Sequence, residues 1–247
     1  DRSVSRGLGD VYKRQIFTIA DRVTVLRDGC CIGSREISQI NTSDLIEMMI
    51  GRALTQQYPP RNAQIGETVL EVSHLGNGST VKDVSFSLRA GEVLGFAGLV
   101  GAGRTETVRM IFGADPKTTG EVLLNGKKAV IRSPRDAIRN GLSFVTEDRK
   151  REGLLLRKSV QSNIVMVALK KVCRMHLIHY PSARKVAQSY VEDLNIVTPS
   201  VNQKSEFLSG GNQQKVVVAK WLFSDAKIII LDEPTRGIDV GAKREIY

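Results

Sequence analysis

The sequence predicts an α/β fold that places a ligand site at the carboxyl edge of a parallel sheet. Ile228–Glu233 begins with four aliphatic residues, as a buried strand does, and ends in two carboxylates. Val93–Ala97 is a second candidate for a buried strand and leads directly into the glycine-rich loop Gly98–Thr105. Leu208–Lys215 is expected to be a loop that opens a helix, with Ser209 as the N-cap. Because helix starts and glycine-rich loops favour anions, these stretches indicate a nucleotide site.

The composition restricts the chain to a globular class. Its 247 residues include 41% hydrophobic and 25% charged residues, enough for a sizeable core and unlike a disordered protein. Lys and Arg outnumber Asp and Glu by 36 to 26, which gives a net charge of +10. This charge suits nucleotides, acidic proteins, RNA or anionic lipid headgroups, although basic residues scattered over a solvated surface are the commoner explanation.

Cysteine usage and hydropathy limit where the protein works. The three cysteines, Cys30, Cys31 and Cys173, show neither a disulfide framework nor the spacing of a zinc site, which favours a reducing compartment. No run approaches the roughly 20 apolar residues that a membrane helix needs. A function at a membrane would therefore require another chain to supply the spanning part.

Residues 16–66 are expected to form a small unit followed by a linker. The expected elements are the end of an apolar helix or connection at Ile16–Ala20, strands at Arg22–Leu26 and Cys30–Glu36, a turn at Arg27–Gly29, and a helix capped by Thr42–Asp44 and stopped by Gly51. The unit is too small to bury its own core, so we interpret it as the end of a larger domain. Gln56–Gly66 contains two prolines and is interpreted as the linker.

From Glu67 onward, apolar runs and turn residues alternate as in a full domain. Strands are expected at Val69–His74, Val84–Leu88, Val93–Ala97, Gly120–Leu124, Ala129–Ile131, Leu142–Val145 and Ile228–Leu231. Helices are expected from the glycine-rich loop to Phe112, from Ser133 to Asn140, and at Val160–Lys171, Ser182–Asn195 and Lys215–Phe223. Asn125-Gly126 predicts a tight hairpin turn, and Pro134 suits the first position of a helix.

The glycine-rich loop fits a phosphate-binding pattern with one substitution. In the pattern Gly-x-x-x-x-Gly-Lys-Ser/Thr, backbone N–H groups surround the phosphates, the lysine reaches their oxygens, and the hydroxyl ligates Mg²⁺. Gly98, Gly103 and Thr105 match, but Arg104 stands at the lysine position. Arginine keeps the charge in a planar fork, so the exchange is not conservative. The alternative is a glycine-rich turn without a ligand.

The two carboxylates after the last strand have distinct expected roles. Asp232 would hold Mg²⁺, directly or through water, and Glu233 would polarise an attacking water. The alternative is that both side chains cap the following turn. That alternative suits an isolated Asp-Glu pair better than one preceded by four apolar residues and followed by Pro234–Asp239.

Taken together, these motifs resemble the ATP-binding cassette (ABC) ATPases. Gly98–Thr105 resembles their Walker A motif, and Leu208–Gln213 resembles their signature motif, with Asn212 where glutamine is usual. Ile228–Glu233 resembles Walker B with the catalytic glutamate, and Gly237–Asp239 resembles the D-loop. The resemblance implies an α/β P-loop NTPase fold with an antiparallel β subdomain and a helical subdomain at about 147–207, truncated.

A closer resemblance is to the tandem-cassette ATPases of bacterial monosaccharide importers, the ribose, galactose and xylose group. Four stretches carry it: Gly101–Glu106, Glu147–Arg151, Leu208–Lys215 and Asp232–Lys243. It covers Ile16–Tyr247. It implies that 16–55 is the end of a first cassette, 56–66 the linker, and 67–247 a second cassette that stops before its carboxyl end. Residues 1–15 do not match what should precede Ile16, and we leave them unassigned as foreign or misread sequence.

The resemblance also implies the cofactors and the site. ATP and Mg²⁺ are the expected cofactors. The nucleotide-binding positions are Gly98, Gly101, Ala102, Gly103, Arg104, Thr105, Glu106, Glu147, Ser209, Gly210, Gly211, Asn212 and Asp239. The Mg²⁺ ligands are Thr105 and Asp232, and the catalytic residue is Glu233.

Compared with the family pattern, the site in this cassette is degenerate. Arg104 replaces lysine, and Glu147 stands where a glutamine would contact Mg²⁺ and water. Gly76–Lys82 lacks the aromatic that would stack on adenine. Because each ATP of an ABC dimer lies between one Walker A and the other signature, we expect Ser209–Gly211 to complete the site of the missing first cassette. The loop at Gly98–Thr105 would bind nucleotide and turn it over slowly or not at all.

The function implied is energising monosaccharide import through a separate membrane permease, a homodimer, and indirectly a periplasmic sugar-binding protein. The missing first cassette is a further partner, no nucleic acid is expected, and the location is the cytoplasmic face of the bacterial inner membrane, peripheral to it. Two alternatives stay open: a soluble tandem-cassette ATPase acting on ribosomes, and a regulatory module that never hydrolyses ATP. The short linker argues against the first, and Asp232-Glu233 against the second.

Overall fold

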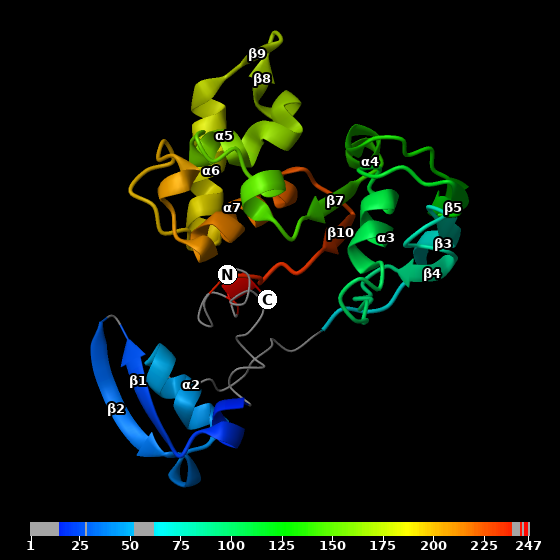
Figure 1. Ribbon diagram of the computed structural model, residues 1–247. Coiled ribbons are helices and arrows are strands. Elements are labelled where there is room, and N and C mark those ends of the chain that lie inside the picture. The colour runs from blue at the N-terminus through cyan, green and yellow to red at the C-terminus, as the bar shows by residue number, and fades with distance from the viewer. Residues whose placement is uncertain (1–14, 28, 52–61, 239–242, 244, 247) are drawn as a thin grey trace. The chain divides into compact units, whose positions relative to one another are not determined.

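The computed structural model describes residues 15–27, 29–51, 62–238, 243 and 245–246, in two compact units (Figure 1). One unit comprises Asp1–Pro60 with Thr235–Tyr247, and the other Arg61–Pro234. Across the described ranges, no helix has the length and apolar character needed to cross a membrane.

The smaller unit is a hairpin that packs on one helix. β1 (Arg22–Arg27) pairs antiparallel with β2 (Cys30–Glu36), and α2 (Thr42–Ile50) covers them, with η1 (Ile37–Gln39) between. Val25, Ile40 and Leu45 form its buried cluster. The cap differs from the prediction, because Asn41 is the N-cap, its side chain accepting from the Asp44 N–H in a capping box. The predicted stop is confirmed: Gly51 adopts a left-handed conformation at φ 84°.

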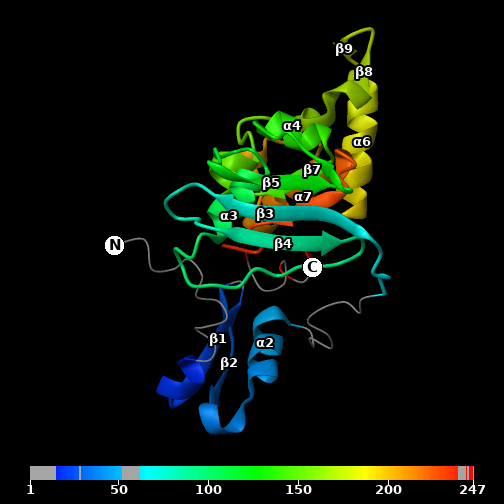
Figure 2. The ribbon, with the colours of Figure 1, turned by 90° about the vertical axis from the view of Figure 1, so that its right-hand side faces the viewer.

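The larger unit begins with an antiparallel sheet of strand order β4-β3-β5-β6 (Figure 2). The strands are β3 (Thr68–Gly76), β4 (Val84–Arg89), β5 (Thr119–Leu124) and β6 (Lys127–Lys128). The predicted turn at Asn125-Gly126 is confirmed, with positive φ at both residues. The expected return strand at Ala129–Ile131 is wrong, because a two-residue turn pairs Leu124 directly with Lys127 and the ladder ends at Lys128.

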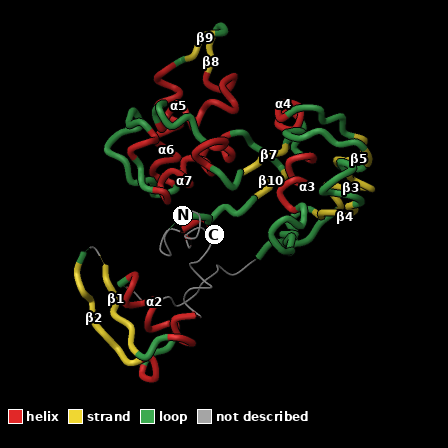
Figure 3. Tube along the Cα trace, in the orientation of Figure 1, coloured by secondary structure: helices red, strands yellow, loops and turns green. Residues whose placement is uncertain are grey.

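The parallel part of the unit pairs β7 (Leu142–Val145) with β10 (Ile228–Leu231), as Figure 3 shows. β7 is buried along its whole length. α3 (Arg104–Ile111) and α4 (Pro134–Arg139) accompany this pair, and α4 has Ser133 as its N-cap and Pro134 at its first position, as predicted for the proline. In register, Val145 lies opposite Leu231, so the residues that follow the two strands emerge at the same edge.

The expected strand at Val93–Ala97 is wrong: this segment has no regular secondary structure. Its side chains are exposed, Val93 by 78%, although Phe96 contacts Phe86 edge to face at 5.0 Å between ring centroids. A strand persists only where neighbours take up its N–H and C=O groups. Among the described residues β7 and β10 pair with each other and not with this segment, which leaves Ile229 and Leu231 exposed as well.

A helical layer completes the larger unit. Its elements are η2 (Arg149–Gly153), α5 (Val160–Val165), η3 (Met166–Val172), β8 (Cys173–Arg174), β9 (Leu177–Ile178), α6 (Tyr180–Asp193), η4 (Ser205–Phe207) and α7 (Gly210–Phe223). The expected single helix at Val160–Lys171 is wrong, since Ala168 leaves the helical region at φ −126° and the second half is a 3₁₀ turn. α6 begins two residues earlier than expected, with His179 as N-cap. α7 begins at Gly210, not Lys215.

One apolar core runs through the sheets and helices of the larger unit. Leu75 and Leu142 are fully buried in it, as are Val216 and Val217 of α7. Trp221 is buried and packs edge to face on Phe112, which follows α3, at 5.7 Å between ring centroids. α7 also packs against β7 and against α5 and η3 of the helical layer.

We expect the isolated 247-residue chain to unfold without a sharp cooperative transition and to aggregate. Val93, Ile229 and Leu231 expose apolar surface beside an open strand edge, a known template for intermolecular pairing. Thermal scans at neutral pH, followed by circular dichroism and light scattering, would test this. A single reversible transition with no rise in scattering would contradict it.

Candidate functional site

The glycine-rich loop lies at the start of α3 and is held in part by glycine conformations. Gly101 and Gly103 have positive φ, at 84° and 86°. Gly103 is the N-cap of α3, and a Cβ there would lie 3.3 Å from the Thr80 carbonyl oxygen, tighter than most real contacts. Gly98 and Ala102 are exposed, and the Ala102 N–H donates to the Leu99 carbonyl. The loop therefore exposes backbone to solvent in front of a helix start, where anions bind.

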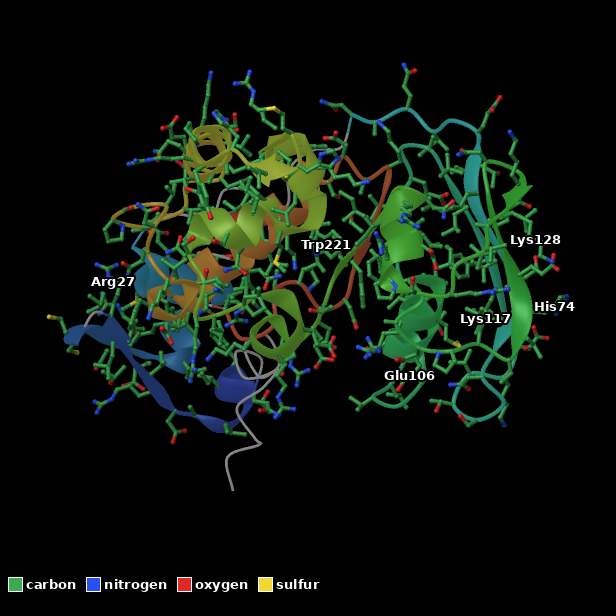
Figure 4. The ribbon with its side chains drawn as sticks, turned by 90° about the horizontal axis from the view of Figure 1, so that it is seen from above. Arg27, His74, Glu106, Lys117, Lys128 and Trp221 are labelled. Carbon is green, nitrogen blue, oxygen red and sulfur yellow. The ribbon has the colours of Figure 1, made fainter. Side chains whose placement is uncertain are left out.

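The first turn of α3 carries the loop's side chains. Arg104 and Thr105 are half-buried, and Glu106 lies on the same turn (Figure 4). The Arg104 Nη2 lies 3.8 Å from Glu233 Oε1. The structure thus brings together the residue at the lysine position and the predicted catalytic carboxylate. At this distance the pair is a loose ion pair, with Glu233 about half exposed.

Asp232 lies at the carboxyl edge of the β7–β10 pair. Its N–H donates to the Val145 carbonyl at 2.9 Å, which continues the ladder by one residue. Its Oδ2 is buried and accepts no hydrogen bond from any described residue. The hydroxyl of Thr146, which follows the neighbouring strand β7, is also buried without a hydrogen-bond partner among the described residues. Glu147 follows Thr146 and is half-buried.

A buried carboxylate oxygen without a donor is costly unless a cation or water meets it. Asp232 therefore fits a divalent cation. In the part of the chain that the structure describes, no three His, Cys, Asp or Glu side chains gather as a metal cluster. Mg²⁺ commonly binds through one or two protein ligands together with substrate phosphates and water, which is compatible with a single buried oxygen here.

The predicted signature segment forms the start of α7. Ser209 is the N-cap, as predicted, and its hydroxyl oxygen accepts from the Asn212 N–H at 3.4 Å and from Asn212 Nδ2 at 2.9 Å. With its acceptor sites engaged, the hydroxyl hydrogen of Ser209 is left to donate. Ser209 is exposed and Gly211 buried, so the helix start faces solvent while α7 itself is anchored.

Asn212 does more than the sequence predicted. Its Oδ1 accepts from the Val197 N–H at 2.8 Å, so one amide joins the N-cap of α7 to the connection that precedes it. Ser209 also accepts, through its carbonyl oxygen, from the Gln213 N–H at 2.9 Å in the first turn of α7. The structure thus brings the glycine-rich loop and Glu233 together, while the hydrogen bonds of Ser209 among the described residues stay within the first turn of α7. Asp239 lies outside the described residues.

Sequence reasoning missed residues that tie these segments together. Arg109 of α3 donates to Asp115 and, through Nη1, to both oxygens of Glu152 in η2, and these carboxylates raise its pKa. Lys220 of α7 donates to the Gly153 carbonyl at 2.6 Å, and burial lowers its pKa to about 8. Both residues connect helices of the site to the segment after Glu147. No sequence signal distinguishes them from cations on the surface.

The basic run Arg149–Arg151 is only partly solvated. Lys150 and Arg151 are exposed, but Arg149 is half-buried and burial lowers its pKa. Asp148 caps this turn by accepting from the N–H groups of Lys150 and Arg151.

The fold and these motifs define a nucleotide-binding cassette of the P-loop type, and the family model described as "ABC transporter" matches residues 81–236. The chain belongs to this family. The dimeric post-hydrolysis structure of the ATP-binding cassette MJ0796, bound to ADP and Pi, is similar at a TM-score of 0.60 and 22% identity over 72% of this chain and 79% of that chain. At that identity the likeness shows the fold.

Curated relatives are similar over nearly the whole chain. A ribose import ATP-binding protein, RbsA 3, of Rubrobacter xylanophilus is 50% identical over 94% of this chain and 47% of that protein. A putative ribose/galactose/methyl galactoside import ATP-binding protein of Burkholderia lata is 47% identical over 98% of this chain and 49% of that protein. The chain spans about half the length of the curated relatives it matches.

Proposed function

We propose that the chain is part of a subunit that binds and hydrolyses ATP to energise monosaccharide import through a separate membrane permease. The ATP chemistry is inferred from one arrangement at the end of β10. Asp232 has a buried Oδ2 that suits a cation, and the next residue, Glu233, lies within ion-pair distance of Arg104. The substrate class comes from the relatives, whose names specify ribose or galactose import. Neither alternative function has a comparable observation in its favour.

The domain organisation we propose places two cassettes in one longer protein. Residues 16–55 would end the first cassette, 56–66 would link, and 67–247 would belong to the second, with a helical subdomain at about 147–207. The relatives support this, since each is about twice as long as the part matched. Residues 1–15 stay unassigned.

In the second cassette, the backbone of Gly98–Thr105 and Glu106 would hold the phosphates, with Glu147 alongside. Thr105 and Asp232 would hold Mg²⁺, which when bound neutralises charge on the phosphate oxygens. Glu233 would orient water, but the cation at Arg104 stands within ion-pair range of it. Because that contact competes with the water that Glu233 would orient, we expect slow turnover at this site.

The signature segment would serve the other nucleotide. Ser209, with its hydroxyl hydrogen left to donate, and the N–H groups of Gly210 and Gly211 would face the γ-phosphate held by the first cassette's own loop. Asn212 would position Ser209, and Asp239 would contribute from the D-loop. Closure on two ATP would drive the permease, and hydrolysis would reset it.

The partners follow from this role. The permease would be a membrane homodimer that receives sugar from a periplasmic binding protein. The subunit would sit at the cytoplasmic face of the bacterial inner membrane without spanning it. The site offers no feature that needs nucleic acid.

Transport by the reconstituted system tests the proposal. The full-length subunit and its permease in liposomes should take up labelled ribose or galactose only with ATP and the binding protein. The matched control omits the subunit. The proposal would be overturned if sugar and binding protein did not stimulate ATP hydrolysis, or if ribosomes did. Nucleotide binding without hydrolysis in the full-length subunit would favour the regulatory alternative.

A further inference from the structure

One segment of the helical layer carries no carboxylate at all. Between Glu152 and Glu192 the chain has no Asp or Glu. The same segment, residues 153–191, contains seven cations: Arg157, Lys158, Lys170, Lys171, Arg174, Arg184 and Lys185. A segment of 39 residues with this bias differs from the mixed charge of an ordinary solvated surface.

These cations are exposed and mostly unmatched. Among the described residues, Lys171 is the member of this set that forms an ion pair, and its partner is Asp225. Lys171 also donates to the Phe223 carbonyl at 2.7 Å. Four exposed cations lie in or near the β8–β9 hairpin in the sequence: Lys170, Arg174, Arg184 and Lys185. They give the surroundings of that hairpin a positive charge.

The hairpin itself exposes apolar side chains. Figures 1 and 2 show β8 and β9 projecting from the helical layer beyond the end of α6. Met175 in its turn is 91% exposed, Leu177 is 74% exposed, and Tyr180 just after β9 is 68% exposed. Single exposed apolar residues are ordinary, but a projecting group of them is not.

We propose that the hairpin, with the cations at its base, binds the anionic headgroup surface of a lipid bilayer. Met175, Leu177 and Tyr180 would enter the interface, and Arg174, Arg184 and Lys185 would meet the headgroup charge. Stable peripheral binding needs two such signals together, an apolar insertion and a basic patch.

The arrangement fits a lipid surface better than a protein groove. Met175 and Leu177 belong to the projecting hairpin and Tyr180 to the start of α6, while the cations are spread over three elements, η3, β8 and α6. A diffuse anionic surface matches dispersed cations, whereas acidic protein sites use a few converging side chains. The proposal does not depend on what the subunit transports.

Vesicle flotation tests the proposal with the full-length protein. Binding is expected to vesicles of phosphatidylcholine with 30% phosphatidylglycerol, a composition on the order of the anionic content that attracts polybasic segments, and not to phosphatidylcholine alone. The variant Arg174→Gln/Arg184→Gln/Lys185→Gln should weaken binding at least about tenfold, given roughly a kcal/mol per cation. Leu177→Ser should weaken it by up to about tenfold and leave the remaining binding more sensitive to salt.

Matched controls lie on the antiparallel-sheet side of the same unit. Lys127→Gln/Arg132→Gln/Arg135→Gln removes the same charge, and Val130→Ser removes an apolar side chain of similar exposure, 63%. Both should bind vesicles as the unchanged protein does. Equal loss in control and hairpin variants would reduce the effect to net charge and overturn the proposal. Equal flotation with neutral and anionic vesicles would also overturn the proposal. Flotation that requires the permease would overturn it as well, because it would assign the hairpin to a protein partner.

Discussion

In the full-length protein, Ser209→Arg is expected to abolish ATP hydrolysis, while Glu233→Gln lowers it by no more than about twofold. The two residues belong to different nucleotide sites under the arrangement proposed here. In that proposal, Ser209 would complete the site whose phosphate loop lies in the first cassette, and Glu233 would serve the loop whose lysine position holds Arg104. Loss of a donor to a transferring phosphate costs on the order of a hundredfold or more in turnover.

The structure gives the physical reason for the Ser209 effect. An arginine cannot accept from the Asn212 N–H, so the cap is lost, and its side chain would occupy the solvent-facing start of α7. The change also removes the hydroxyl that Asn212 Nδ2 orients at 2.9 Å. Steady-state hydrolysis and ATP binding would be measured on the same preparations. The expected result is that turnover is lost.

Ser159→Arg is the matched control for capping. Ser159 caps α5 by accepting from the Ser162 N–H at 3.1 Å, and it lies outside the proposed site. It should lower stability by about 1 kcal/mol, as a lost cap does, and leave ATP turnover near that of the unchanged protein. If Ser209→Arg and Glu233→Gln remove hydrolysis to the same extent, the asymmetry between the two sites is wrong.

Local signals predicted the local structure around these residues well. Ser209 was predicted as an N-cap because Ser favours that position, and Gly51 as a helix stop because glycine adopts positive φ. The strand ending in Asp232 was predicted from its aliphatic run and is β10. In each case the determining interaction lies within a few residues.

Predictions that depend on distant partners failed. Val93–Ala97 has the composition of a strand, but a strand needs neighbours on which to pair, and composition does not reveal whether they are there. The role of Asn212 was missed for the same reason, because Val197 lies 15 positions away and contributes a backbone N–H. The sequence can place a motif, but not the residues that hold the motif in position.

Asn163 is the clearest example of a residue that holds a motif in position. The substitution Asn163→Asp is expected to destabilise the helical layer by about 3–5 kcal/mol. Its side chain is fully buried. Nδ2 donates to the carbonyls of Leu155 and Ser159 at 3.0 Å and to Ser205 Oγ at 3.1 Å, while Oδ1 accepts from the Leu155 N–H at 2.8 Å. A carboxylate in this place would face carbonyl oxygens that need a donor, without a cation nearby.

The loss should extend to the nucleotide site. Ser205 lies between Asn163 and α7, since its carbonyl accepts from Gln213 Nε2 at 3.0 Å. Asn163 thereby fixes the turn that precedes Ser209, and we expect Asn163→Asp to lower ATP turnover along with stability. The amide of Leu155, protected by Asn163 Oδ1, should exchange its hydrogen faster, which mass spectrometry of the peptide that contains it would detect.

Ser162→Ala separates this network from general damage to α5. Ser162 is the neighbouring residue, exposed, and its hydroxyl contacts Ser159 at 2.9 Å. Its loss should change stability by less than about 1 kcal/mol and leave exchange at Leu155 unaltered. Because a buried Asp has its pKa raised, the penalty of Asn163→Asp is present at neutral pH and declines as the pH falls through that pKa. An Asn163→Asp protein with unchanged exchange at Leu155 and full turnover would show that the signature is held in place by α7 packing alone.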